Sequence, residues 1–322
     1  MDVKDPVGHH ARARGEGGRA VATGADTTVV PLRHPARWLA ASVLGVVVAS
    51  LIFSAARNDR FQWDVVASNL FNSRVLSGLW LTLWLTAVSM GIGLLLGIVL
   101  ATMRLSPNPV LRIVSGAYIW IFRGTPLLVQ LLFWSFIAAV YPKLNFGVPF
   151  GGPSIVSFNG TQLISPLTAA ILGLGLNQSA YQAEIVRAGL LAVDEGQVEA
   201  AHALGLTRGQ TLRRVVLPQA MRVIIPPTGN ETINMLKTTS LVSVVAVTEL
   251  LYAVQLIYAQ NYQQIPYLVI ASIWYLFFTT VLSVGQHYLE RRFSRGSSRR
   301  RPESTSQRLR AWLAARRIGG VA

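Results

Sequence analysis

The sequence predicts an all-α integral membrane protein with six transmembrane helices, and three observations support this prediction. Of 322 residues, 52% are hydrophobic and only 13% are charged, and the mean hydropathy is +0.43. This composition excludes a soluble enzyme of ordinary kind. Apolar runs long enough to cross a bilayer recur along the chain. Positive residues lie beside these runs in the asymmetric pattern that orients membrane proteins.

The net charge of +15 would suggest nucleic acid in a cytosolic protein. Because the positive residues flank apolar runs, membrane orientation explains the charge better, and we expect no nucleic-acid partner. The chain has no cysteine, so it has no disulfide and no cysteine metal site. The pair His9 and His10 lies in a tail without periodicity, and we expect a solvated tail there and no metal site.

The first span is expected at 38–56, within an additional N-terminal transmembrane helix at 37–57 that follows a disordered basic tail at 1–36. A cleavable signal peptide is the alternative, with small residues at Ser54, Ala55 and Ala56. We favour a retained span because the preceding tail is long for a signal sequence. A short external connection at 57–74 is expected to lie along the membrane interface through Trp63, Val65, Val66, Leu70 and Phe71.

The second span is expected at 78–103, where Gly91, Gly93 and Gly97 would let another helix approach closely. The third is expected at 113–140, with a break near Pro126, which lacks a helical donor. Arg123 precedes this break and should face protein or water, or extend to the membrane surface.

An external loop is expected at 141–162 from its Gly, Pro, Asn and Ser content, before a fourth span at 166–191. In that span, Glu184 and Arg187 have the spacing of a local ion pair. Alternatively, Asn177, Tyr181 and Glu184 share a helical face and line a translocation path. Both interpretations remain open at this point.

The fifth span is expected at 228–259, with Pro226 and Pro227 marking its start. Asn234 and Lys237 share one face of it. An ammonium group at this depth needs a partner, so Lys237 either pairs with Glu184 or contacts substrate. The sixth span is expected at 267–286, and a basic tail follows at 291–322, in which 307–318 forms an amphipathic helix or stays disordered.

A polar stretch at 193–218, here called the elbow, separates the fourth and fifth spans. Asp194 with Gln197, and Thr207 with Gln210, have the spacing of capping boxes, so each pair is expected to begin a short helix. Gly205 stands between these helices, where a left-handed residue is needed to end the first. The elbow therefore predicts two rigid helices that meet at a glycine.

The spacing of the elbow resembles the EAA signature of permease subunits of bacterial binding-protein-dependent ABC importers. The matching positions are Glu199, Ala200, Ala201, Gly205, Val215, Leu217 and Pro218, of which Val215 departs from the usual isoleucine and Pro218 is expected to end or bend its helix. In that family this loop docks on the cytoplasmic ATPase. The resemblance implies that Glu199, Ala200, Ala201, Gly205, Leu217 and Pro218 couple the chain to an ATPase.

Two further segments, 122–130 with its Arg-Gly-Thr-Pro sequence and 179–189, resemble the polar amino-acid importers of this family. The resemblance implies a MetI-like fold, with a permease core at 76–290 that contains the elbow. It also implies three partners: an ABC ATPase, an extracytoplasmic solute-binding protein, and a second permease subunit that is either the same chain or a paralogue. The candidate path residues are Arg123, Thr125, Gln130, Asn177, Tyr181, Glu184, Asn234, Lys237 and Ser240.

The chain contains no G-x-x-x-x-G-K-[ST] loop, so we expect no bound cofactor, no enzyme activity, and ATP use by the partner ATPase. Six spans place both termini and the elbow on the side richer in arginine, which the positive-inside rule assigns to the cytoplasm of a bacterial inner membrane. The predicted function is ATP-driven import of polar amino acids by alternating access. The alternatives are an ABC permease for another small solute, such as an opine, and an ion-driven secondary transporter.

Overall fold

The computed structural model describes residues 35–147, 154–159 and 164–293. The chain divides into two compact units, Met1–Arg57 and Asn58–Ala322. In the first unit, α1 (Pro35–Arg57) is a single helix whose large apolar side chains are exposed. It is long and apolar enough to cross a membrane, as predicted for 37–57. The tail predicted at 1–36 and almost all of that at 291–322, including the helix at 307–318, lie outside the described residues.

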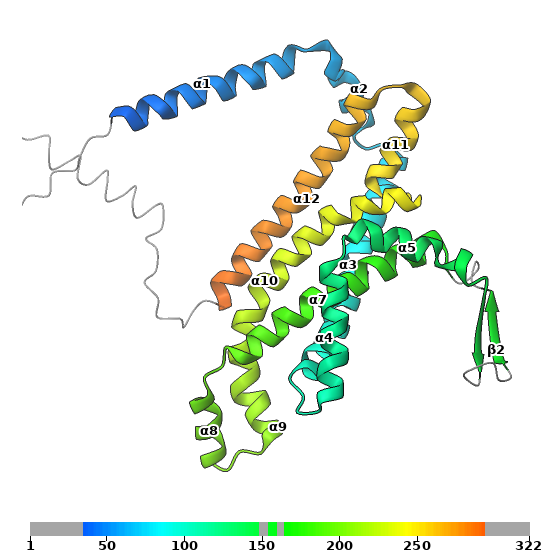
Figure 1. The fold of residues 1–322 in the computed structure, drawn as a ribbon. Coiled ribbons are helices and arrows are strands. Elements are labelled where there is room, and N and C mark those ends of the chain that lie inside the picture. Colours follow the sequence, from blue (N-terminus) through cyan, green and yellow to red (C-terminus); the bar gives the residue numbers. More distant parts are fainter. Residues whose placement is uncertain (1–34, 148–153, 160–163, 294–322) are drawn as a thin grey trace, which may run out of the picture. The chain divides into compact units, whose positions relative to one another are not determined.

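In its described residues the second unit is helical apart from one hairpin, and Figure 1 shows its elements in order. Its elements are η1 (Asp59–Phe61), α2 (Trp63–Asn69), α3 (Ser73–Arg104), α4 (Pro109–Gly124), α5 (Leu127–Val140), β1 (Lys143–Gly147), β2 (Ser154–Asn159), α7 (Pro166–Leu191), α8 (Glu195–Ala203), α9 (Arg208–Thr211), η2 (Leu212–Val216), α10 (Leu217–Thr238), η3 (Thr239–Val245), α11 (Leu250–Asn261) and α12 (Gln264–Phe293).

The α3 and α7 helices pack closely and run in the same direction at the centre of this unit. A Cβ atom added to Gly93 would lie 2.6 Å from the Gln178 side chain, and one added to Gly97 would lie 2.6 Å from the Cβ of Gln182. Glycine therefore sets the separation of the two helices, as predicted for Gly93 and Gly97. Gly91, the third glycine of that prediction, meets nothing within 4 Å and has no part in this contact.

Two of the predicted spans are bent. The α4 and α5 helices meet at 106°, at the break predicted near Pro126. The region from Arg208 to Val245 meets α11 at 47°. The prediction that Pro226 and Pro227 mark the start of the fifth span was wrong, because α10 begins at Leu217 and runs through both prolines.

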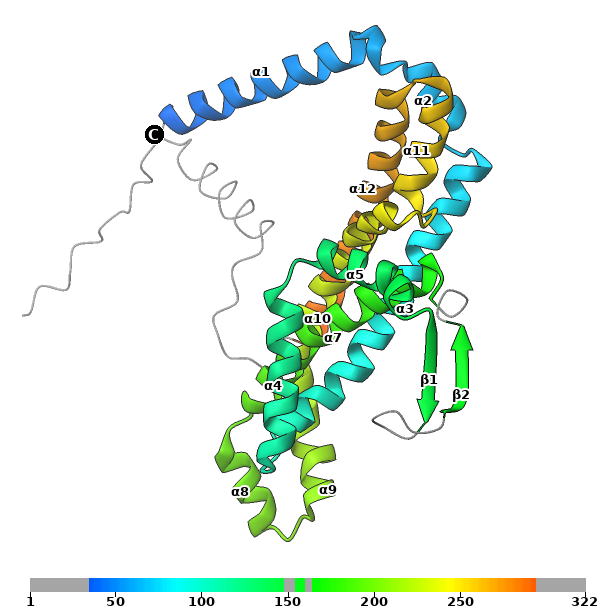
Figure 2. The ribbon, with the colours of Figure 1, turned by 45° about the vertical axis from the view of Figure 1, so that its right-hand side comes forward.

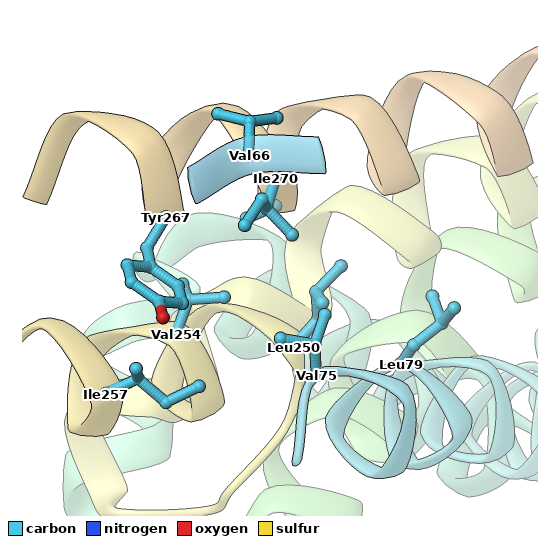
Figure 3. Packing of buried hydrophobic residues seen from close by; sticks show 9 residues of the cluster. Val66, Val75, Leu79, Leu250, Val254, Ile257, Tyr267 and Ile270 are labelled. Carbon is cyan, nitrogen blue, oxygen red and sulfur yellow. The ribbon is translucent and has the colours of Figure 1, made fainter. Parts of the chain in front are cut away.

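A hydrophobic cluster joins α2, α3, α11 and α12 (Figure 3). It lies at the end of the unit that is away from α8 and α9 (Figure 1). Val66 on α2 is only 5% exposed and packs in the same cluster as Ile270 and Val254. The prediction that Val66 lies along the membrane interface was therefore wrong. Trp63 and Phe71 from the same segment do remain exposed.

The loop predicted at 141–162 contains a short antiparallel hairpin, in which Lys143 pairs with Asn159 and Phe146 with Val156 (Figure 2). Among the residues that the structure describes, three helices are suitable by length and composition for crossing a membrane, or five if each bent pair counts as one span. The remaining predicted span corresponds to α7. This helix has 26 residues, but its central turns carry buried polar side chains. A count of six spans stays a prediction.

Candidate functional site

The elbow folds into two short helices, as its sequence predicts, and Figures 1 and 2 show α8 and α9 beyond the ends of α7 and α10. Gly205 has a φ of +80°, in the left-handed region. The N–H of Leu206 donates to the carbonyl of Ala201 at 3.1 Å, and the N–H of Gly205 donates to the carbonyl of His202 at 2.9 Å. This pair of bonds is the Schellman motif, which satisfies carbonyls at the end of α8.

The two capping boxes predicted in the elbow have different outcomes. Thr207 and Gln210 form one: the N–H of Thr207 donates to the side chain of Gln210 at 2.9 Å, and the N–H of Gln210 donates to the Thr207 hydroxyl at 3.4 Å. The box predicted for Asp194 and Gln197 was wrong, because the carboxylate of Asp194 accepts from the N–H of Gly196 at 2.9 Å instead. The start of each helix is nevertheless capped by the side chain of the residue that precedes it.

The second elbow helix continues directly into the membrane domain through a π-helical turn, η2, and then α10. Pro218 lies in the first turn of α10, directly after the π-helical turn, and the helix continues through it. The prediction that Pro218 ends this helix was therefore wrong, and the alternative, that it bends the helix, stays a prediction. The consequence is a helical path from Arg208 at the elbow to Thr238 in the domain, with no loop between them.

The side chains of the elbow are divided between exposed and buried positions. Glu199, Ala200 and Gly205 are exposed, whereas Ala201 is only 3% exposed and packs inside the elbow. Leu204, directly after the end of α8, was not among the predicted site residues, yet it is 83% exposed. Its position as the last residue before Gly205 is the sequence signal that could have identified it. Single exposed leucines are normal on protein surfaces, so the exposure of Leu204 alone assigns it no role.

The break between α4 and α5 is held by two predicted path residues, Gln130 and Asn177. Because Pro126 has no N–H, the carbonyl of Phe122 loses its helical donor. The amide of Gln130 donates to this carbonyl at 2.9 Å and to the Thr125 hydroxyl at 2.7 Å, and the amide of Asn177 donates to the same carbonyl at 2.9 Å. These amides therefore stabilise the break, and their hydrogen-bonding capacity is largely used there.

The remaining path candidates lie on α4, α7, α10 and η3 and are not all brought together. On α7, Glu184 pairs with Arg187 at 2.8 Å, which is the local ion pair considered from the sequence. The guanidinium of Arg123 lies 5.3 Å from the ring centre of Tyr181, within cation–π range. Arg123 and α7 are thus in contact near the break.

Lys237 is exposed near the end of α10 and has no ion pair within 4.0 Å with another described residue. The predicted pair between Lys237 and Glu184 is therefore absent from the part of the chain that the structure describes. Asn234 is also exposed and lies one turn before Lys237 on the same face of α10. The hydroxyl of Ser240 donates to the carbonyl of Lys237 at 2.7 Å.

Two carboxylates in the helical core were missed by the sequence analysis. Glu249 is fully buried at the start of α11 and accepts from the N–H of Tyr252 at 2.8 Å, the N–H of Leu251 at 3.0 Å and the hydroxyl of Tyr275 at 2.8 Å. Its carboxylate therefore caps the start of α11 inside the domain. Glu231 on α10 accepts from the amide of Gln178 on α7 at 3.3 Å. For Glu249, a carboxylate inside an apolar run is the signal that could have identified it.

Comparisons with known proteins agree with this geometry. Residues 93–295 match the model of a family described as binding-protein-dependent transport system inner membrane component. The chain is 47% identical over 270 residues to an arginine transport system permease protein of Corynebacterium glutamicum, which covers 84% of each chain. It is 34% identical to a glutamine transport system permease protein of Escherichia coli, over 72% of this chain and 98% of that protein.

Among solved structures, one described as an amino acid ABC transporter with histidines is 37% identical and has a TM-score of 0.58, covering 69% of this chain and 95% of the other. A methionine ABC transporter in an inward-facing conformation is 21% identical with a TM-score of 0.52, over 68% of this chain and 96% of the other. The second likeness concerns the fold alone.

Proposed function

Because the chain belongs to the binding-protein-dependent transport system inner membrane components, we propose that it is the permease subunit of an ATP-driven importer of polar amino acids. It is a multi-pass protein of the inner membrane, and its family works with an ATPase and a solute-binding protein. The chain itself is no enzyme. Its relatives carry arginine and glutamine, according to their names. These two solutes share the α-amino and α-carboxylate groups, which defines the substrate class proposed here.

The elbow is the observation that carries this proposal. Its two helices are capped at their starts, joined by a Schellman turn and followed by a continuous helix into the domain. The exposed Glu199 and Leu204 offer a charge and an apolar contact to a docked ATPase. We assign the coupling role to Glu199, Ala200, Ala201, Gly205, Leu217 and Pro218, with Leu204 added.

Force from the ATPase would travel along α9, η2 and α10. The Thr228 hydroxyl on α10 donates to the side chain of Gln182 on α7 at 3.1 Å, and Gln286 on α12 donates to the carbonyl of Pro226 at 3.1 Å. These contacts tie α10 to both neighbouring helices. A displacement of the elbow therefore moves α10 together with its neighbours, which is the rigid-body motion that alternating access needs.

The proposed substrate path runs past the ends of α4 and α10. Arg123 and Lys237 provide two cations without a carboxylate partner in the described chain, and cations of this kind suit the carboxylate of an amino acid. Gln130 and Asn177 hold the α4–α5 break that presents Arg123. Glu184 and Tyr181 on α7 and Thr125 at the break complete the polar surface, with Asn234 and Ser240 beside Lys237.

We further propose that two permease subunits pair about an axis normal to the membrane, each with its elbow on one ATPase. The arginines at 208, 213, 214 and 222 lie in or beside the elbow, so the positive-inside rule favours a cytoplasmic elbow and cytoplasmic termini. ATP is then bound by the partner ATPase and no cofactor is held by this chain. This arrangement brings the elbow to the compartment that supplies ATP.

Reconstitution in vesicles tests the function. Uptake of radiolabelled arginine and glutamine is measured with the permease, its ATPase and its binding protein, and each component or ATP is omitted in turn. We expect uptake only when all are present. Uptake driven by a proton or sodium gradient without ATP would instead support a secondary transporter. ATP-driven uptake of an opine but of neither amino acid would keep the ABC mechanism and overturn the substrate class.

A further inference from the structure

The α10 and α12 helices lie side by side (Figure 1), and a hollow of about 510 Å³ opens between the start of α10 and the last turn of α12. Its volume falls within the range of ligand pockets, about 300–1,000 Å³. Residues from both helices line it: Pro218, Met221, Arg222, Ile225, Arg292 and Phe293.

The hollow combines two cations with an apolar lining. Arg222 and Arg292 are exposed, and the side chain of neither makes a hydrogen bond or ion pair with another residue in the described part of the chain. The nearby carboxylate of Glu290 accepts from the amide of Gln286 at 3.0 Å and does not line the hollow. Guanidinium groups bind phosphate oxygens through paired hydrogen bonds. The site is therefore suited to a phosphate group that carries an apolar chain.

We propose that this hollow binds an anionic phospholipid, whose headgroup phosphate contacts Arg222 and Arg292 and whose acyl chain lies along Met221, Ile225 and Phe293. The position supports this ligand, because both helices are predicted to reach the membrane surface at this end. Basic pockets between helix ends on the cytoplasmic side bind such headgroups. The chain's own tail at 294–322 is an unsuitable occupant, because its arginines would repel those of the hollow.

Such a lipid would affect coupling. Pro218 is the last residue of the elbow, and Arg222 lies one turn further along α10. The bound lipid therefore contacts the turn of α10 that connects the elbow to the rest of the domain. By also contacting Arg292 and Phe293, it would join the start of α10 to the end of α12. The proposal does not depend on which solute is carried.

Native mass spectrometry of the assembled transporter in detergent tests the site. Three probes are compared: phosphatidylglycerol, phosphatidylcholine with the same chains, and glycerol phosphate, which has the headgroup without the chains. We expect selective retention of phosphatidylglycerol. Arg222→Gln and Arg292→Gln should each lower its association constant about fivefold, since one arginine near an anionic membrane surface contributes a factor of this size.

The matched control is Arg112→Gln, because Arg112 is an exposed arginine on α4 outside the hollow. This variant should retain phosphatidylglycerol like the wild type. Equal retention of phosphatidylcholine, or an equal loss in Arg112→Gln, would overturn the proposal. Saturation by glycerol phosphate at the same concentration would show a site for free anions and not for lipid. If a variant fails to assemble, the three probes compared on the wild type decide the question.

Discussion

Replacing Gly205 with alanine should weaken the coupling of ATP hydrolysis to transport. Gly205 has a φ of +80°, and no atom lies within 4 Å of the Cβ that alanine would add. The cost is therefore one of backbone conformation alone, about 1–2 kcal/mol for a residue with a side chain. This lowers the equilibrium constant between bent and unbent elbows by about 5–30-fold. Because coupling free energies are typically about 1–3 kcal/mol, such a loss is large enough to measure.

The assay is the initial rate of ATP-dependent uptake in proteoliposomes, with the amount of inserted permease measured for each variant. Gly209→Ala is the matched control, since Gly209 is also in the elbow, also has nothing within 4 Å of an added Cβ, and lies in α9 with an ordinary helical φ. Gly205→Asn should recover part of the rate, because asparagine tolerates the left-handed region. Full activity of Gly205→Ala, or an equal loss in Gly209→Ala, would refute the reasoning.

Three further substitutions test the packing and the path. Gly97→Val should lower the free energy of unfolding in detergent by about 1–3 kcal/mol, because the added Cβ would lie 3.0 Å from the backbone nitrogen of Ala183. Gly91→Val is the control and should leave stability unchanged, because the Cβ added there would meet nothing within 4 Å. Equal melting temperatures of the two variants would contradict this. Glu249→Ala should cost about 1–3 kcal/mol in the same measurement, since the Tyr275 hydroxyl and two N–H groups lose their acceptor, and a wild-type melting curve would be evidence against it. Lys237→Gln should reduce uptake while leaving basal ATP hydrolysis unchanged, and Lys237→Arg should retain more; unchanged uptake in both would remove Lys237 from the path.

The elbow could be predicted from sequence because short-range chemistry determines it. A threonine cap at Thr207 and a left-handed glycine at Gly205 act within a few residues, and each has a distinct sequence signature. The break before α5 could be predicted for the same reason, since Pro126 removes its own donor. The helical character of the spans follows from the length of the apolar runs, whereas the hairpin of β1 and β2 lies in the loop between two spans.

Features that depend on neighbouring helices could not be predicted in this way. Pro226 and Pro227 look like a helix start, but α10 runs through them and is held there by the contact from Gln286. The pair between Lys237 and Glu184, one of the two alternatives for Lys237, is absent from the described chain, where Glu184 pairs with Arg187 on its own helix. The role of Glu249 depends on Tyr275, which is distant in sequence.

The enclosed position of α7 has a consequence for how the protein is made. Asn177, Gln178 and Gln182 are buried against other helices. In α7 alone, these amides would face the acyl chains without hydrogen-bond partners. The ribosome makes α3 before α7, so the surface formed by Gly93 and Gly97 is already present when α7 is inserted. Insertion of α7 is then an assembly step, and a defect in that glycine surface would appear as failed biogenesis before it appeared as lost transport.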